Sequence, residues 1–268
     1  VTPAIDEIVW SFIPDQNTRL NAVKAGQVHY AQVTPTQVAE VQALPGYEVH
    51  LVSSNSFMHF DLSLNTENAR ALFSDPSVRR ALFHAIDRQA IADQLFQGTV
   101  RVANTPLNPT SPYHNPEVVA SSYDPDRARR TLDEAGWTPG PDGIRVKDGR
   151  RFSFQMLNRA GSTDRIQVAQ VIQAQLRQVG VEVTFETLES AAWTQQWRNG
   201  SWEGIVSAWF LPADPSLTGL YACDGPNNMT GFCDPELDEV MEASDRELDP
   251  EARVALLHQA QEGVAARY

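Results

Sequence analysis

The 268-residue sequence has very little lysine and few cysteines, and it is poor in positive charge. Lys24 and Lys147 are its only lysines, and 34 acidic residues outnumber 21 basic ones, which gives a formal net charge of −13. This balance excludes nucleic acid or an anionic membrane surface as a partner, because both require a basic face. No run of about twenty apolar residues occurs, so the sequence predicts no membrane-spanning helix.

The motifs of common catalytic and metal sites are also missing. The sequence has no Gly-x-Ser-x-Gly and no Walker loop, and its six histidines include no i, i+4 pair. Cys223 and Cys233 lack a nearby histidine pair, which leaves either a local disulfide or two free thiols. We therefore expect no catalytic residue, no metal site and no cofactor. An α/β hydrolase whose site is assembled from distant residues stays open as the alternative.

The clearest helical signal lies in residues 71–98. Asp75 is placed to cap a helix with Pro76 in its first turn, and Asp87 to cap a second helix that Gly98 ends. Apolar residues follow the first cap at i, i+3, i+4, i+7 and i+8 spacing. They are Val78, Ala81, Leu82, Ala85 and Ile86. This spacing predicts a packed pair of helices.

Strand and helix signals alternate along the chain, which predicts the α/β class. Strands are expected over 5–13, 28–33, 47–64 (in two halves), 152–157, 181–188 and 202–210. Helices are expected over 15–27, 34–44, 124–136, 162–179 and 190–199, and after Asp234 and Asp249. Residues 99–122 read as an extended loop and 139–149 as a hairpin. The helix over 162–179 should connect two parallel strands.

Three segments resemble a known family. They are "DPSVRRALFHAIDRQAI" from Asp75, "YDPDRARRTLDEAGW" from Tyr123 and "QLRQVGVEVTFETLESAAW" from Gln175. Together they resemble the extracellular solute-binding proteins of family 5, the receptors of peptide, nickel and related ABC importers. The resemblance implies a periplasmic-binding-protein-like fold of two α/β lobes, and it implies export, which favours a disulfide between Cys223 and Cys233.

The resemblance also implies how the chain divides. Residues 1–64 would form part of the first lobe with the strand that crosses between lobes. Residues 65–268 would form a second lobe that is complete or nearly so. The last helix would lead back toward the missing part of the first lobe.

The function that this resemblance implies is capture of a small solute, such as a peptide or saccharide, by hinge closure. The expected partners are that solute and an ABC permease in the membrane, with the receptor itself a monomer. The expected location is extracytoplasmic, either in the periplasm or lipid-anchored at the cell surface. A sensor or binder of the same fold that has lost transport is the alternative within the family.

Aromatic residues concentrate in the third quarter of the chain, where they could form stacking walls for a ligand or simply pack in the core. Asn158 follows a strand at the edge where open α/β sheets place ligand groups. Asn227 or Asn228 could reach the ligand or cap the loop, and Asn55 and Phe57 could line a cleft or form hinge backbone. The expected ligand-binding residues are Trp197, Trp209, Phe210, Asp214, Asn227, Asn55, Phe57 and Asn158.

The segment after Trp209 departs from the family pattern. "WFLPADPSL" resembles a stretch in which the family places an aspartate that pairs with the α-amine of a peptide. Here residues 210–212 replace that aspartate, and Asp214 belongs to a later Asp-Pro pair. A buried ammonium needs a carboxylate partner. The expected ligand is therefore neutral or weakly charged, with flat or apolar faces.

Overall fold

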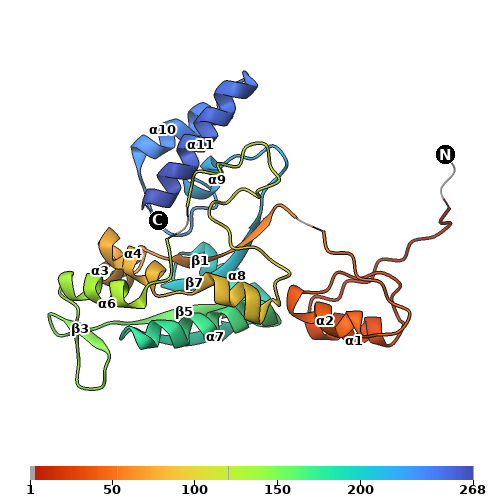
Figure 1. Cartoon of the computed structure of the whole chain (residues 1–268), viewed down its shortest axis with the longest axis horizontal. Helices are drawn as coiled ribbons and strands as arrows, with labels where there is room; N and C mark the ends of the chain where they lie inside the picture. The colour runs from red at the N-terminus through yellow and green to blue at the C-terminus, as the bar shows by residue number, and fades with distance from the viewer. Residues whose placement is uncertain (1–3, 53, 120, 268) are drawn as a thin grey trace.

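A four-stranded mixed sheet lies at the centre of the computed structural model, which describes residues 4–52, 54–119 and 121–267 (Figure 1). The strand order is β1-β7-β5-β6, with β1 at one edge. β5 pairs in parallel with β6 and β7, and β1 pairs antiparallel with β7. The strands are β1 (Ser56–Leu62), β5 (Ser153–Arg159), β6 (Glu182–Leu188) and β7 (Gly204–Phe210). The parallel pair β5 and β6, joined by helix α7, confirms the predicted β-α-β unit.

Helices α3, α4, α6, α7 and α8 pack on this sheet, and a small three-stranded sheet of order β2-β3-β4 projects from it. The longer helices are α1 (Gln16–Lys24), α3 (Glu67–Phe73), α4 (Pro76–His84), α6 (Pro125–Glu134), α7 (Thr163–Gln178), α8 (Ser190–Arg198), α10 (Pro235–Arg246) and α11 (Pro250–Arg267). The short elements are η1 (Pro35–Gln37), α2 (Val38–Gln42), α5 (Arg88–Ala90), the π-helix η2 (Ile91–Leu95), β2 (Thr138–Pro139), β3 (Arg145–Lys147), β4 (Arg150–Arg151) and α9 (Thr218–Tyr221). Within the described residues, no helix has both the length and the apolar character needed to span a membrane.

The main core lies between one face of the sheet and helices α3, α4, α6 and α7. The whole predicted stripe of the first helix belongs to this core, and none of its five side chains is more than 7% exposed. Asp75 Oδ1 accepts a hydrogen bond from the Ser77 amide at 2.8 Å, so the predicted cap is confirmed. The predicted second helix begins at its expected cap, Asp87, but after α5 it continues as the π-helix η2.

The N-terminal region differs from the prediction. The expected strands over 5–13 and 28–33 and the first half of 47–64 have no strand conformation, and only the second half forms β1. Trp10, Phe12 and Tyr30 are mostly exposed. A strand needs a neighbour that accepts and donates its backbone hydrogen bonds. No described segment pairs with these residues, so their β-favouring composition does not produce a strand here.

Helices α1 and α2 form a small unit set apart from the sheet and joined to β1 by an extended segment (Figure 1). Its larger buried apolar residues are Leu20, Val23, Val38 and Val41. The unit contacts the rest of the chain through the side chain of Gln16, whose Nε2 donates to Asp164 Oδ1 at 2.9 Å. Asp164 lies in the first turn of α7, so the contact ties α1 to the helix that covers the sheet.

The loop over 99–122 contains neither helix nor strand among its described residues, as predicted, yet it is firmly attached. Its anchor is Gln261 of α11, a fully buried side chain. Gln261 Oε1 accepts from the Asn115 amide at 3.0 Å, and its Nε2 donates to the Tyr113 carbonyl at 2.8 Å. One buried amide therefore satisfies two backbone groups of the loop and fixes it against α11.

Arg145 in β3 is a buried cation, with its side chain only 4% exposed. Its guanidinium donates to the carbonyls of Val179, Trp137 and Arg129 and to the carboxylate of Asp133. Gly180 lies directly against it, and a Cβ at that position would come within 2.8 Å of Arg145 Cγ. The small sheet, α6 and the end of α7 therefore meet at one side chain.

Arg145→Leu should lower the free energy of unfolding by about 3 kcal/mol, because the substitution leaves buried carbonyl acceptors and a carboxylate without their donor. Chemical denaturation followed by circular dichroism measures this change. The control is Arg127→Leu on the exposed side of α6, which should change the stability by less than about 0.5 kcal/mol. Equal stability of the two variants would show that Arg145 does not hold these elements together.

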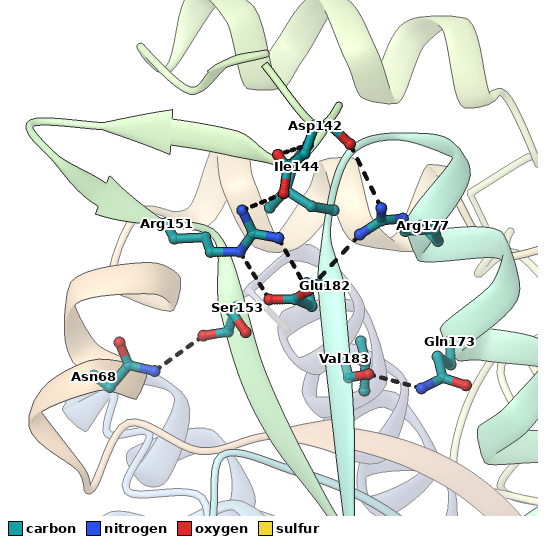
Figure 2. A network of polar contacts seen from close by, with 9 residues as sticks. All are labelled: Asn68, Asp142, Ile144, Arg151, Ser153, Gln173, Arg177, Glu182 and Val183. Carbon is teal, nitrogen blue, oxygen red and sulfur yellow. Dashed lines mark hydrogen bonds and ion pairs between the residues drawn. The ribbon is translucent and has the colours of Figure 1, made fainter. Parts of the chain in front are cut away.

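A second polar network joins the small sheet to β6 (Figure 2). Arg151 of β4 binds Glu182 through two hydrogen bonds, from Nε at 2.8 Å and from Nη2 at 3.0 Å, and it also pairs with Asp142 at 2.6 Å. Arg177 of α7 approaches the same Glu182 carboxylate at 3.8 Å. The hydrogen bonds from Arg151 and then from Ser153 lower the pKa of Glu182 to about 2.

The lowered pKa of Glu182 predicts a pH-dependent contribution to stability. A carboxyl group whose folded pKa lies below its unfolded value stabilises the fold above the unfolded value, near 4.5, and loses this contribution as the pH falls through about 2. Glu182→Gln should therefore melt at a lower temperature than the parent at pH 7, and the difference should vanish by pH 2. Glu134→Gln, on the exposed face of α6, is the control. A difference that is the same at both pH values would contradict the assignment.

Candidate ligand-binding site

The second face of the sheet carries polar side chains where β1 and β7 pair. On β1, Phe57, His59 and Asp61 alternate with apolar residues that pack into the main core. The register pairs Phe57 with Trp209 and His59 with Ser207, so these side chains share one face of the sheet. The edge pair β1–β7 therefore turns an aromatic and polar surface away from the core.

Tryptophans of α8 cover this face. Trp193 and Trp197 stack with ring centroids 5.7 Å apart and planes at 8°, and Trp197 lies 5.7 Å from Trp209 at a tilt of 53°. Trp193 and Trp202 are nearly fully buried and pack with Ile205 in a small separate core. The aromatic residues thus form two groups. Trp193 and Trp202 are buried and support α8, whereas Trp197 and Trp209 face the polar side of the sheet.

The loop between α9 and α10 closes the opposite side. Cys223 and Cys233 form a disulfide across it. Inside the ring that they close, Asn228 Nδ2 donates to the carbonyls of Ala222 at 2.8 Å and Phe232 at 2.7 Å. Asn65, just after β1, donates from Nδ2 to the Met229 carbonyl at 2.9 Å. The loop is therefore braced internally and fixed to the end of β1.

A cavity of about 30 Å³ lies between these three walls. Its lining residues are His59, Asp61, Trp197, Trp209, Leu220, Tyr221, Asn227, Met229 and Thr230. His59 Nδ1 lies 2.8 Å from Asp61 Oδ1, with the two side chains 14% and 28% exposed. His59 Nε2 is buried and has no hydrogen-bond partner among the described residues. The cavity combines aromatic walls with one carboxylate and one imidazole.

Three of the expected ligand-binding residues meet in this cavity. Trp197 and Trp209 form its aromatic walls, and Asn227 lines the loop side. The Asn227 amide donates to the Gly219 carbonyl at 2.9 Å, so its backbone is held by the start of α9. That these three residues bind a ligand stays a prediction, but the structure places them in one cavity.

The other expected residues lie elsewhere. Phe210 is 68% exposed and is not among the lining residues. Asp214 pairs with Arg253 of α11 at 2.6 Å, which gives it a structural contact. Phe57 packs on the His59 ring at 5.4 Å, just outside the cavity. Asn55 and Asn158 do not line the cavity either. The carbonyl of Asn55 accepts from the Leu211 amide at 3.0 Å, and Asn158 is buried in β5.

His59 and Asp61 were not among the expected ligand-binding residues. The signal for them is the alternation in "FMHFDL", where Met58, Phe60 and Leu62 are apolar and the residues before each of them are aromatic or polar. Such a pattern marks a strand with one core face, and it does not reveal what covers the other face. No group of three side chains suited to hold a metal ion occurs among the described residues.

Comparison with known proteins identifies the family of this chain. Residues 2–231 match the bacterial extracellular solute-binding proteins, family 5 Middle. The chain belongs to this family. Its members are solute-binding proteins rather than enzymes. This family membership contradicts the hydrolase alternative.

Relatives with curated descriptions include Protein XP55 of Streptomyces lividans, 30% identical, in a match that covers 98% of this chain and 48% of the relative. The oligopeptide-binding protein AppA of Bacillus subtilis is 31% identical, with 82% and 40% covered. The solved structure of AppA in complex with a nonapeptide superimposes with a TM-score of 0.88 at 27% identity, covering 95% of this chain and 51% of that one. This chain therefore spans about half the length of its relatives, and its α/β fold matches part of a periplasmic binding protein.

Replacing both Cys223 and Cys233 by serine should destabilise the loop wall. Closing so short a ring constrains the unfolded chain by roughly 3 kcal/mol. The double variant should therefore melt at a lower temperature, and amide exchange should accelerate in residues 218–232. The parent, alkylated without reduction, should show no free thiol by intact mass. Two alkylated cysteines in the folded parent would contradict the disulfide.

Proposed function

We propose that this chain forms the solute-binding part of a receptor that serves an ABC importer. The cavity between β1, α8 and the disulfide loop carries this proposal, because it gathers aromatic and polar side chains from three distant segments in a chain of this family. Residues 65–268 correspond to a second lobe, and residues 1–64 to part of a first lobe with the crossing strand β1. The whole receptor is bi-lobed and acts outside the cytoplasm.

The mechanism is closure of two lobes over the solute. The cavity is small, and the lining residues supply only one side of a site that would enclose a peptide-sized molecule. Contacts from the opposing lobe complete it, and the solute favours the closed state by the difference in its affinity for the two states. The closed receptor then docks on a membrane permease. No bond of the solute is made or broken.

The relatives indicate the range of solutes. They include an oligopeptide-binding protein from Bacillus subtilis and a nickel-binding periplasmic protein from Escherichia coli, the latter 31% identical over 220 residues. No group of three metal-ligating side chains occurs in the described part of this chain, whereas Trp197 and Trp209 offer stacking area. The two tryptophans therefore support an organic solute. Import, rather than a sensor role, is favoured by the family alone.

Trp209→Ala in the full-length receptor should weaken solute binding by about 1–3 kcal/mol, the usual loss for a well-packed aromatic anchor. The probe is the solute that co-purifies with the receptor, identified by native mass spectrometry and titrated by calorimetry. Phe210→Ala is the matched control, because Phe210 follows Trp209 on the same strand but lies outside the cavity. Unchanged affinity in the Trp209 variant would show that the cavity is not part of the binding site. A larger loss of affinity in the Phe210 variant would show the same.

A further inference from the structure

Asp61 carries the negative charge of the cavity. Its carboxylate lines the cavity and is 28% exposed in this structure, and its neighbour within hydrogen-bond distance is His59 Nδ1. No arginine or lysine occurs among the lining residues. When the ring of His59 is neutral, the pair keeps a net charge of −1. Closure over a solute would remove the remaining water from that charge, which is costly unless a positive group takes its place.

Aromatic faces complete the environment of this carboxylate. Trp197, Trp209 and Tyr221 all line the same cavity. The face of an aromatic ring is negative, so a cation within about 6 Å of the ring centre is attracted to it, most strongly by tryptophan. A carboxylate among aromatic walls disfavours anions and fits a positively charged nitrogen.

His59 adds a directional feature. When the proton on Nδ1 is donated to Asp61, the other ring nitrogen, Nε2, is an acceptor. This atom is buried and has no partner among the described residues. An N–H donor of a bound solute would satisfy it, whereas a quaternary ammonium would not.

From these contacts we infer that the cavity binds a cationic nitrogen of the solute, either a protonated amine or a quaternary ammonium, with Asp61 as its counter-charge and Trp197 and Trp209 as its walls. This inference rests on the proposed receptor function. It also changes the ligand class expected from the segment after Trp209. The carboxylate missing from that segment is supplied by the neighbouring strand, β1, so a neutral solute is no longer favoured.

The test uses three small probes with the full-length receptor, read by tryptophan fluorescence and calorimetry at pH 7. The first two have nearly equal shape, and the third is smaller. Choline carries a quaternary ammonium, 3,3-dimethylbutan-1-ol is its neutral counterpart, and ethanolamine carries a primary ammonium. At least one cationic probe should bind about tenfold or more tightly than the neutral one. Tighter binding of ethanolamine would indicate that the ammonium donates a hydrogen bond to His59. Tighter binding of choline would indicate that the aromatic walls and the carboxylate suffice.

Asp61→Asn tests the residue itself. It should weaken the preferred cationic probe by about tenfold or more and leave the neutral probe unchanged, since the amide keeps the shape and removes the charge. Asp148→Asn, in the exposed turn between β3 and β4, is the matched control and should bind as the parent does. If Asp61→Asn does not fold, the comparison of charged and neutral probes on the parent decides alone.

Equal or tighter binding of the neutral probe would overturn the charge assignment, and so would an Asp61 variant that keeps its affinity for the cation. The receptor function is judged separately by the co-purified solute. If that solute binds and Trp209→Ala weakens it, while no cationic probe binds or competes, the charge assignment fails and the receptor function stands. If no solute binds at all, both fail.

Discussion

Antiparallel pairing between β1 and β7 joins two parts of the chain that are far apart in sequence, and the candidate site depends on this pairing. The ladder runs from Ser56 opposite Phe210 to Leu62 opposite Gly204. A slip of one residue would turn His59 and Asp61 into the core and Phe60 out of it. Gly204, at the end of the ladder, packs so closely on the core that a Cβ there would lie 2.8 Å from the Phe154 ring. The register is thus fixed by core packing on one face and decides what the other face presents.

The remaining walls follow from this ladder. Trp209 lies near the end of β7, where α8 brings Trp197 against it, and the disulfide loop is fixed to the segment that follows β1. Each wall is rigid for its own reason: strand pairing, buried tryptophan packing, or a covalent ring braced by Asn228. Under the proposed function, a preformed half-site of this kind needs little reordering when a solute arrives, so the free energy of binding is available to favour closure.

The sequence predicts local structure well and long-range pairing poorly. The capped helices after Asp75 and Asp124 and the unit β5-α7-β6 were predicted because caps and periodicity are written in contiguous residues. The prediction of strands over 5–13 and 28–33 was wrong, because a β-favouring segment forms a strand only where a partner strand lies beside it. Trp197, Trp209 and Asn227 were predicted from composition and family pattern. His59 and Asp61 were not, because their shared cavity exists only once β1 pairs with β7.

The proposed function requires above all that Trp197 and Trp209 face the bound solute. The indole N–H resonances of the full-length receptor, assigned by single-tryptophan substitution and followed as the co-purified solute is added, test it directly. We expect the Trp197 and Trp209 signals to shift on binding and the signal of Trp137, which is nearly fully buried in the main core, to stay in place. Saturable binding that leaves the Trp197 and Trp209 signals unmoved would contradict it.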